Sequence, residues 1–161
     1  MIYRESFTAE CGGEAFEITV FATDTAVTAI LYGRCEVVFP NAITAEAVSQ
    51  LREYFGGSRK EFCFPVDLTL APDATPFRLS VWRELLKVPF GETVTYGELA
   101  LRIGKPSAAR AVGGAVGMNP LLFAVPCHRV VAKDGIGGFS AGLVLKRHLM
   151  SLEGIVQDRE D

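Results

Sequence analysis

A thiol and an imidazole stand side by side in the segment VPCHRVV, residues 125–131. A free thiol has a pKa of about 8.5, so only a few per cent of it is the nucleophilic thiolate at neutral pH. His128 is the local base that can take the proton of Cys127. Adjacent side chains of an extended segment point to opposite sides, so we expect a bridging water between sulfur and ring. The residue types alone leave three interpretations open: a reaction centre, a metal site or part of the core.

An imidazole that accepts a proton needs a carboxylate to hold its tautomer and to balance its charge. Glu153 is the candidate, at the end of a final helix. We expect this helix to begin near Ala141 with Ser140 as its cap, and to stop at Gly154.

The other cysteines do not suggest chemistry. Cys11, Cys35 and Cys63 form no CxxC pair and are interpreted as reduced structural thiols. His128 and His148 are 20 residues apart, and the first 75 residues contain no histidine. We therefore predict no metal and no other cofactor.

The composition is that of a water-soluble globular protein: 161 residues, 49% apolar and 22% charged. No apolar run approaches the roughly 18 residues that span a bilayer, and the N-terminus does not resemble a signal peptide. We expect a cytoplasmic protein, or a nuclear one in a eukaryote, without a membrane partner. The net charge of −3 divides unevenly, with 5 basic and 11 acidic residues in 1–75 against 11 and 8 in 76–161.

The first half predicts an α/β domain, residues 1–75. Strands are expected at 15–22 and 26–33 as a hairpin, and at 34–40. A helix is expected over 44–57 with Thr44 as its cap, followed by another extended run at 62–70. The segment APDATP, residues 71–76, reads as the linker to a second domain, 76–161.

The second half predicts helices. The first starts with Thr75 as cap and Pro76 in its first turn, and its apolar stripe comprises Phe77, Val81, Leu85 and Leu86. The next, over 95–104, opens with a capping box of Thr95 and Glu98. A third follows within 105–120, with Ser107 as its cap. Two short helices joined by a turn are typical of a helix-turn-helix.

The third of these helices contains AARAVGGA, residues 108–115. Each mid-helix glycine costs about 1 kcal/mol relative to alanine. Two explanations remain open: close packing of another helix, or close approach to the backbone of a nucleic acid, whose minor groove is only about 6 Å wide. Arg110 is the one long side chain on this smooth surface.

Residues 77–154 resemble the O6-alkylguanine-DNA alkyltransferase family. The resemblance rests on VPFGETVTYGELA, AARAVGG, NP, PCHRVV and LEG, in this order and with compact spacing. It implies an α+β fold: a ribonuclease H-like N-terminal α/β domain, then a mainly helical domain with a winged helix-turn-helix. It also implies a monomer whose partner is duplex DNA containing O6-alkylguanine.

The resemblance further implies catalytic roles. Cys127 would take the alkyl group from guanine O6 in a single irreversible displacement, with His128 as its base through water and Glu153 orienting His128. Tyr96 would donate a proton to the flipped-out guanine. Asn119 would act as the hinge between the recognition helix and the active-site loop.

Further roles implied by the resemblance concern DNA and the guanine pocket. Arg110 would enter the base stack as a finger. The DNA-contacting residues around it would be Ser107, Ala108, Ala109, Gly113 and Gly114. The guanine pocket would be formed by Arg129, Val130, Phe139, Ser140 and Ala141.

Two departures from the family pattern carry expectations. Gly117 and Met118 stand where an arginine often precedes the asparagine, so one phosphate contact is missing and DNA binding should be weaker and less salt-sensitive. Phe139 and Ala141 replace a common tyrosine and glycine, and the methyl of Ala141 should narrow the pocket against benzyl-sized groups.

Two rival functions remain distinguishable by experiment. A thiol hydrolase would turn over repeatedly and would need an oxyanion hole rather than a smooth DNA-facing helix. A plain DNA-binding regulator would not need Cys127.

Overall fold

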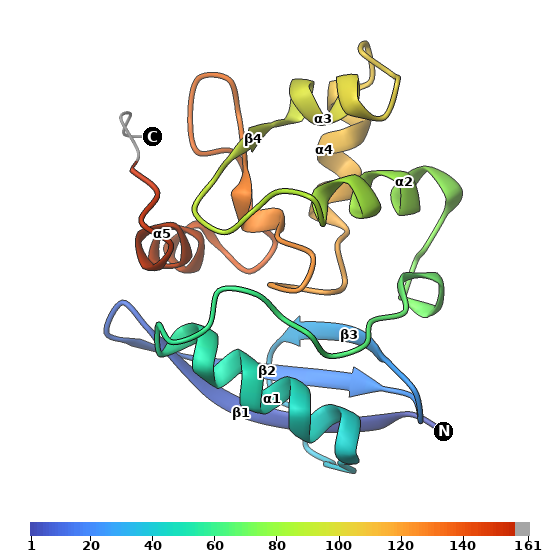
Figure 1. Ribbon diagram of the computed structural model, residues 1–161, viewed down its shortest axis with the longest axis vertical. Coiled ribbons are helices and arrows are strands. Elements are labelled where there is room, and N and C mark those ends of the chain that lie inside the picture. The colour runs from blue at the N-terminus through green and yellow to red at the C-terminus, as the bar shows by residue number, and fades with distance from the viewer. Residues whose placement is uncertain (157–161) are drawn as a thin grey trace. The chain divides into compact units, whose positions relative to one another are not determined.

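The computed structural model describes residues 1–156. It has the expected α+β fold, with a three-stranded sheet, a two-stranded pair and five α-helices among those residues (Figure 1). The chain divides into two compact units. Unit 1 comprises residues 1–72 and 120–124, and unit 2 comprises 73–119 and the residues from 125 on.

The sheet of unit 1 is an antiparallel meander of β1 (Tyr3–Cys11), β2 (Glu14–Ala22) and β3 (Val27–Tyr32). The predicted hairpin of β2 and β3 is confirmed, whereas β1 was not predicted. The strand predicted over 34–40 is wrong, because only Phe39 makes a bridge there, to Arg4.

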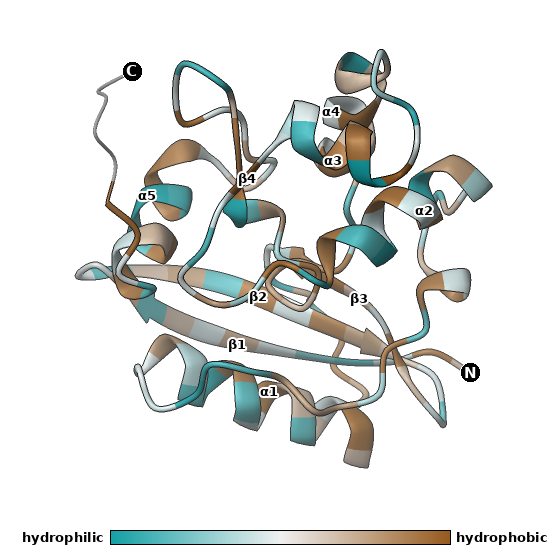
Figure 2. Cartoon of the chain, turned by 45° about the horizontal axis from the view of Figure 1, so that its top comes forward, coloured by the Kyte–Doolittle hydropathy of each residue, from teal (hydrophilic) through white to brown (hydrophobic). Residues whose placement is uncertain are grey.

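The helix of unit 1, α1 (Ala42–Phe55), packs against this sheet (Figure 2). The prediction of Thr44 as its cap is wrong: Asn41 is the cap, and its side chain accepts the backbone N–H of Thr44 at 2.8 Å. Thr44 returns the contact, because its hydroxyl accepts the N–H of Asn41 at 2.9 Å. Asparagine is at least as strong a cap as threonine, and the helix therefore starts about one turn before the predicted position, at Asn41 instead of Thr44.

The extended run predicted over 62–70 is correct only in part. Val66 bridges Val27 in a parallel sense, but Leu68–Leu70 form the 3₁₀ helix η1. The side chain of Asp67 caps this helix by accepting the N–H of Thr69 at 2.9 Å.

Five residues from the second half of the sequence complete unit 1. The backbone N–H of Ile30 donates to the carbonyl of Pro120 at 2.8 Å, and Leu122 donates back to Ile30 at 3.0 Å. Phe123, only 1% exposed, sets its ring edge-on to Phe55 with centroids 5.1 Å apart. Segment 120–124 therefore belongs to the core of unit 1, although its sequence neighbours belong to unit 2.

Unit 2 begins with α2 (Pro76–Leu85), which starts at the predicted Thr75 cap. The stripe predicted for it is wrong at Leu86, which is 47% exposed because the helix ends one residue earlier. The next helix, α3 (Tyr96–Arg102), has the predicted cap Thr95, whose hydroxyl accepts the N–H of Glu98 at 3.1 Å.

Helix α4 (Ala109–Gly117) packs against both α2 and α3. Its predicted cap Ser107 is wrong: Ala108 occupies the cap position, and no side chain caps the helix. The indole of Trp82 holds α4 from the side of α2, donating to the carbonyl of Ala115 at 2.9 Å.

Directly before α3, the short strand β4 (Val94–Thr95) pairs in parallel with β5 (Val130–Val131), which follows α4 in the chain. The last helix is α5 (Leu143–Leu152). The predicted start of α5 at Ala141 with Ser140 as cap is wrong. Gly142 precedes the helix with φ +99°, a left-handed conformation that ends the loop and cannot continue a right-handed helix.

In residues 1–156, no helix combines the length and the apolar character that crossing a membrane requires.

Candidate active site

Cys127 lines a small pocket of unit 2, with a cavity volume of about 90 Å³. The pocket is formed where α3, α4 and the loop before α5 meet. Five predicted site residues line it together, namely Tyr96, Gly113, Cys127, Phe139 and Ser140. Val116, Gly117 and Gly138 complete the lining.

Cys127, His128 and Arg129 form one turn of 3₁₀ helix, η2. The extended conformation predicted for them is wrong, because the N–H of Cys127 bonds to the carbonyl of Val125 at 2.8 Å and starts a turn. All three side chains are buried, with exposed fractions of 2%, 0% and 7%.

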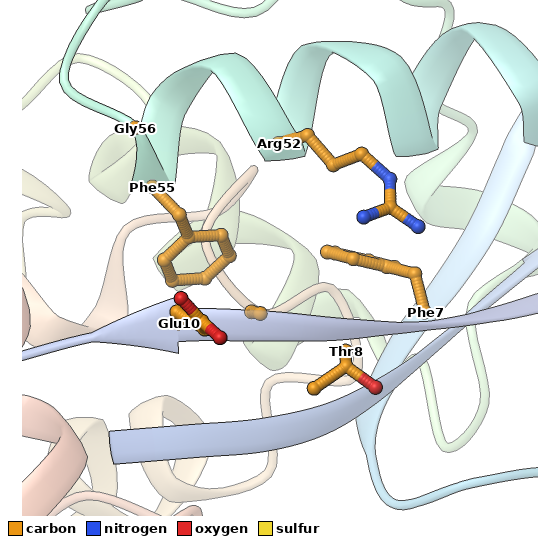
Figure 3. A pocket seen from close by; sticks show the side chains of 7 residues that line it. Phe7, Thr8, Glu10, Arg52, Phe55 and Gly56 are labelled. Carbon is orange, nitrogen blue, oxygen red and sulfur yellow. The ribbon is translucent and has the colours of Figure 1, made fainter. Parts of the chain in front are cut away.

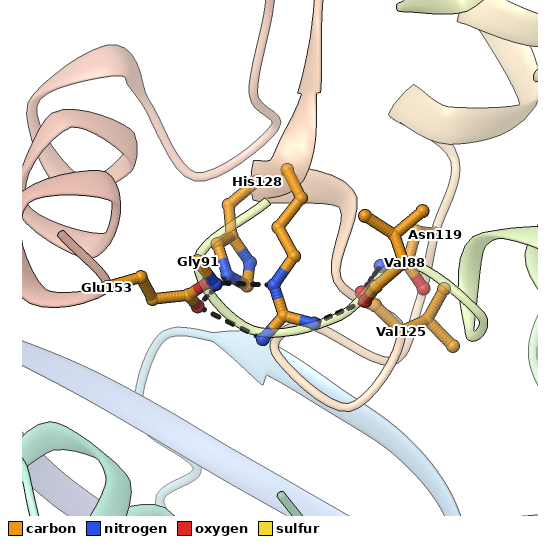
Figure 4. Close-up of polar contacts among 7 residues, drawn as sticks. Val88, Gly91, Asn119, Val125, His128 and Glu153 are labelled. Atoms are coloured by element: carbon orange, nitrogen blue, oxygen red, sulfur yellow. Dashed lines mark hydrogen bonds and ion pairs between the residues drawn. The ribbon is translucent and has the colours of Figure 1, made fainter. Parts of the chain in front are cut away.

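The imidazole of His128 lies against the carboxylate of Glu153. Its Nε2 is 2.6 Å from Oε2 of Glu153, and the two side chains are fully buried (Figure 4). Glu153 caps the C-terminus of α5, so the end of that helix positions the carboxylate behind the ring.

Arg129 and Gly91 fix the same carboxylate. Nε of Arg129 donates to Oε1 of Glu153 at 2.8 Å, and its Nη2 donates to Oε2 at 3.2 Å. Nη1 donates to the carbonyl of Val88 at 2.7 Å, and the backbone N–H of Gly91 donates to Oε1 at 3.0 Å (Figure 4). These hydrogen bonds hold the carboxylate in one orientation. Arg129 therefore acts on Glu153 and is not among the residues that line the pocket.

Burial dominates the acid–base properties of the thiol and the imidazole. It raises the pKa of Cys127 to about 11, against the opposing effects of a hydrogen bond from Asn119 and the charge of Lys146. Burial also lowers the pKa of His128, although Glu153 works in the other direction. At neutral pH the resting pair is therefore a thiol and a neutral imidazole, which can accept a proton.

Asn119 stands where the chain leaves unit 2 for segment 120–124. Its side-chain amide donates to the carbonyl of Val125 at 2.8 Å, at the point where the chain re-enters unit 2 (Figure 4). Asn119 is 5% exposed. One side chain thus ties together the two ends of the excursion and approaches the sulfur of Cys127.

The side chain of Tyr96 lines the pocket, and its hydroxyl lies at the loop of Gly137 and Gly138. It accepts the backbone N–H of Gly138 at 3.1 Å, and its ring passes close to Gly113, whose added Cβ would be 3.7 Å away. Such a distance is an ordinary contact, so packing alone does not require glycine at 113.

The surface of α4 carries the remaining predicted DNA-binding residues. Arg110 and Gly114 are exposed, and Ala108 and Ala109 are half-buried. A Cβ added at Gly114 would meet no atom within 4 Å among the described residues. Helix packing therefore does not explain Gly114, and of the two explanations considered, close approach of an external backbone remains.

Sequence reasoning missed Lys146 of α5, which is fully buried. Its ammonium donates to the carbonyl of Val130, predicted as a pocket residue, at 2.6 Å. The available signal was positional, because Lys146 precedes the buried Leu149 and Met150 by three and four residues, on the apolar face. Ala141, the last predicted pocket residue, is half-buried and absent from the pocket lining.

A larger, open cavity lies in unit 1, between α1 and β1 (Figure 3). The guanidinium of Arg52 lies over the ring of Phe7, 5.1 Å from the ring centroid. Thr8 and Glu10 are the other polar residues that line this cavity. This cavity contains no cysteine or histidine. In residues 1–156, no three His, Cys, Asp or Glu side chains gather as metal ligands would.

Fold and site together define a thiol-centred α+β protein, and comparisons with known proteins identify its family. Residues 76–155 match the family described as 6-O-methylguanine DNA methyltransferase, DNA binding domain. A methylated-DNA–protein-cysteine methyltransferase of Methanosarcina acetivorans is 49% identical over 110 residues, which are 68% of each chain.

Solved structures of Mycobacterium tuberculosis proteins indicate the same family. Its OGT in complex with DNA superposes with a TM-score of 0.80 at 36% identity, over 93% of this chain and 91% of that one. Its O6-methylguanine methyltransferase superposes with a TM-score of 0.79 at 34% identity, over 99% and 97%. The chain belongs to the methylated-DNA–protein-cysteine methyltransferase family, which confirms the resemblance found in its sequence.

Proposed function

We propose that this protein repairs duplex DNA by transferring the alkyl group of O6-alkylguanine irreversibly to its own Cys127. The single observation that carries the proposal is the pocket in which Cys127 and Tyr96 meet, backed by the buried His128–Glu153 pair. Relatives in Methanosarcina acetivorans and Mycobacterium leprae are named methylated-DNA–protein-cysteine methyltransferases, and these names support the same reaction.

The thiol must lose its proton as it attacks. His128 is neutral because burial lowers its pKa, and its Nε2 is committed to Glu153, so Nδ1 is the ring atom that takes the proton through a water. Glu153, held by Arg129 and Gly91, stabilises the imidazolium that forms. Because burial keeps the resting thiol protonated, sulfur becomes an effective nucleophile only when its proton passes to His128.

Tyr96 assists the leaving group. A sulfur lone pair forms the S–C bond as the C–O6 bond breaks, and the electrons of that bond stay on guanine, which takes the hydroxyl proton of Tyr96. The proton held by His128 then returns to the tyrosinate through solvent. Net, the thiol proton ends on guanine. The product is a thioether without an easy leaving path, so each molecule reacts once.

The reactive carbon lies inside the base stack, so the nucleotide must be flipped out at a cost of a few kcal/mol. In this proposal α3 and α4 form a helix-turn-helix and loop 132–138 its wing. Ser107, Ala108 and the smooth face of α4 as far as Gly114 lie against the DNA, and Arg110 replaces the extruded base. Asn119 is the hinge between α4 and the active-site turn, a role that its bond to Val125 supports.

In the guanine pocket, Phe139 and Ser140 contact the base. Val130 and Ala141 do not line this pocket, so their roles there, a carbonyl acceptor and a limit on the size of the alkyl group, rest on the family resemblance alone. Arg129 acts behind the pocket rather than in it, through its ion pair with Glu153.

The remaining features of the proposal follow the family pattern. The N-terminal α/β domain, residues 1–75, is ribonuclease H-like, and residues 76–161 form the DNA-binding and alkyl-acceptor domain. The protein acts as a monomer without a cofactor, in the cytoplasm, or in the nucleus of a eukaryote.

Intact-mass spectrometry tests this function. After incubation with a duplex containing O6-methylguanine, we expect a gain of one methylene unit that is absent in Cys127→Ser. A protein that stays unmodified while the lesion persists would refute the proposal. Repeated turnover of a thioester would favour the thiol hydrolase instead.

A further inference from the structure

Lys146 is a fully buried charge that the reaction outlined above does not use. Its ammonium donates to three backbone carbonyls: Val130 at 2.6 Å, Ile136, and Gly138 at 2.9 Å. Three acceptors match the three N–H bonds of an ammonium group. A buried lysine is costly unless it is satisfied in this way.

All three carbonyls belong to the segment between the catalytic turn and the pocket wall. Val130 directly follows η2, and Ile136 and Gly138 flank Gly137 in the loop that reaches the pocket. Lys146 therefore joins α5 to both ends of this segment and determines where the loop around Gly137 lies.

That loop holds the hydroxyl of Tyr96. The N–H of Gly138 donates to it at 3.1 Å. A Cβ added at Gly137 would lie 2.8 Å from the same oxygen, and Gly137 has φ +77°, so the hydroxyl rests in a space that only glycine leaves open. Gly138 is thus bound on both sides, by Lys146 at its carbonyl and by Tyr96 at its N–H.

The bond from Gly138 also sets the direction of the Tyr96 proton. A phenol that accepts an N–H through a lone pair keeps its own O–H for donation elsewhere. Tyr96 lines the pocket, so that proton is available to a base bound there.

We infer that Lys146 is a positioning residue, which acts through the loop of Gly137 and Gly138 to hold the Tyr96 hydroxyl where it can protonate the departing guanine. This inference rests on the proposed function. A group misplaced by about 1 Å can cost about 100-fold in rate, so losing the ammonium should slow transfer without removing any reacting group.

A double-mutant cycle with Tyr96 tests the inference. Lys146→Met should slow single-turnover methyl transfer from O6-methylguanine DNA by about 10- to 100-fold. In a Tyr96→Phe background the same change should cost less than about threefold, because no hydroxyl is left to position. The Kd for the duplex should stay the same. Arg147→Met is the matched control, since it removes an exposed charge from the next position of α5.

Alkylation of Cys127 by iodoacetamide, followed by peptide mass spectrometry, separates the alternatives, because iodide leaves without a proton. Because the charge of Lys146 lowers the pKa of Cys127, Lys146→Met should also slow this alkylation, but by a clearly smaller factor than it slows methyl transfer. If Lys146→Met slows methyl transfer and iodoacetamide alkylation equally, the charge acts on the sulfur. If Lys146→Met slows methyl transfer equally in wild type and in Tyr96→Phe, Lys146 does not act through the Tyr96 hydroxyl. Either result overturns the inference.

Gly137→Ala keeps the test available if Lys146→Met does not fold. Its methyl group displaces the Tyr96 hydroxyl while Lys146 remains, so methyl transfer should fall more in wild type than in Tyr96→Phe, and equal losses would contradict us. Wild-type protein that acquires no methyl group at Cys127 refutes the proposed function itself, and this inference with it.

Discussion

At the scale of the single residue, burial protects the thiol of Cys127 from reagents in solution. Its pKa is about 11, so at lower pH only a small fraction is thiolate, and this fraction rises about tenfold for each unit by which the pH increases towards 11. Accidental alkylation of the resting protein is therefore slow at neutral pH, and in the proposed reaction the His128–Glu153 pair takes the proton of the thiol.

This burial predicts a pH profile. The rate at which iodoacetamide modifies Cys127 in the free protein should rise about tenfold per pH unit from pH 7 to 10, as followed by peptide mass spectrometry. In urea-unfolded protein the rise should level off near the ordinary thiol pKa of about 8.5. A folded-state rate that is flat between pH 7 and 9 would show that the thiol is already ionised.

At the scale of elements, helix starts illustrate what local sequence determines. Thr75 and Thr95 cap α2 and α3 as predicted, because each directly precedes a helical run and accepts an N–H three residues on. The prediction failed for Thr44 and Ser107, where a competing residue or an uncapped turn starts the helix. Local chemistry offers several possible caps, and packing of the helix selects one.

Gly114 of α4 gives a prediction at this scale. Gly114→Ala should raise the free energy of unfolding by about 0.5–1 kcal/mol, because alanine favours a helix and the methyl group meets no atom within 4 Å. The same change should weaken duplex binding, since the methyl group stands where the DNA backbone would approach. Urea unfolding and a fluorescence titration measure the two effects. A more stable variant with unchanged affinity would remove α4 from the DNA interface at this position.

At the scale of the whole molecule, segment 120–124 links the two halves of the sequence. Phe123 adopts φ +71°, a conformation that a bulky residue rarely takes, and its ring is buried in the core of unit 1. Phe123→Ala should lower the free energy of unfolding by about 3–5 kcal/mol. Leu86→Ala, at a position 47% exposed, is the control and should cost less than about 1 kcal/mol. Similar losses in the two variants would contradict this account of the core.

Charge distribution is also a property of the whole molecule. The second half carries 11 basic against 8 acidic residues, yet Lys146 and Arg129 are buried and cannot meet phosphate. Met118 is 42% exposed just after α4. Met118→Arg should strengthen duplex binding and steepen the plot of log K against log salt by about 0.9, the value for one added phosphate contact. If a fluorescence titration finds the same salt slope for Met118→Arg as for wild type, the protein does not lack a phosphate contact at this position.

The sequence by itself determined the family, the α+β class, the hairpin, and five of the residues that meet in the pocket. These depend on short motifs and on local periodicity, which one stretch of chain contains. Only the tertiary structure showed that Arg129 forms an ion pair with Glu153, that Lys146 is buried against three carbonyls, and that residues 120–124 are part of unit 1. Such pairings join residues between 8 and about 90 positions apart, and burial, rather than residue type, makes them strong.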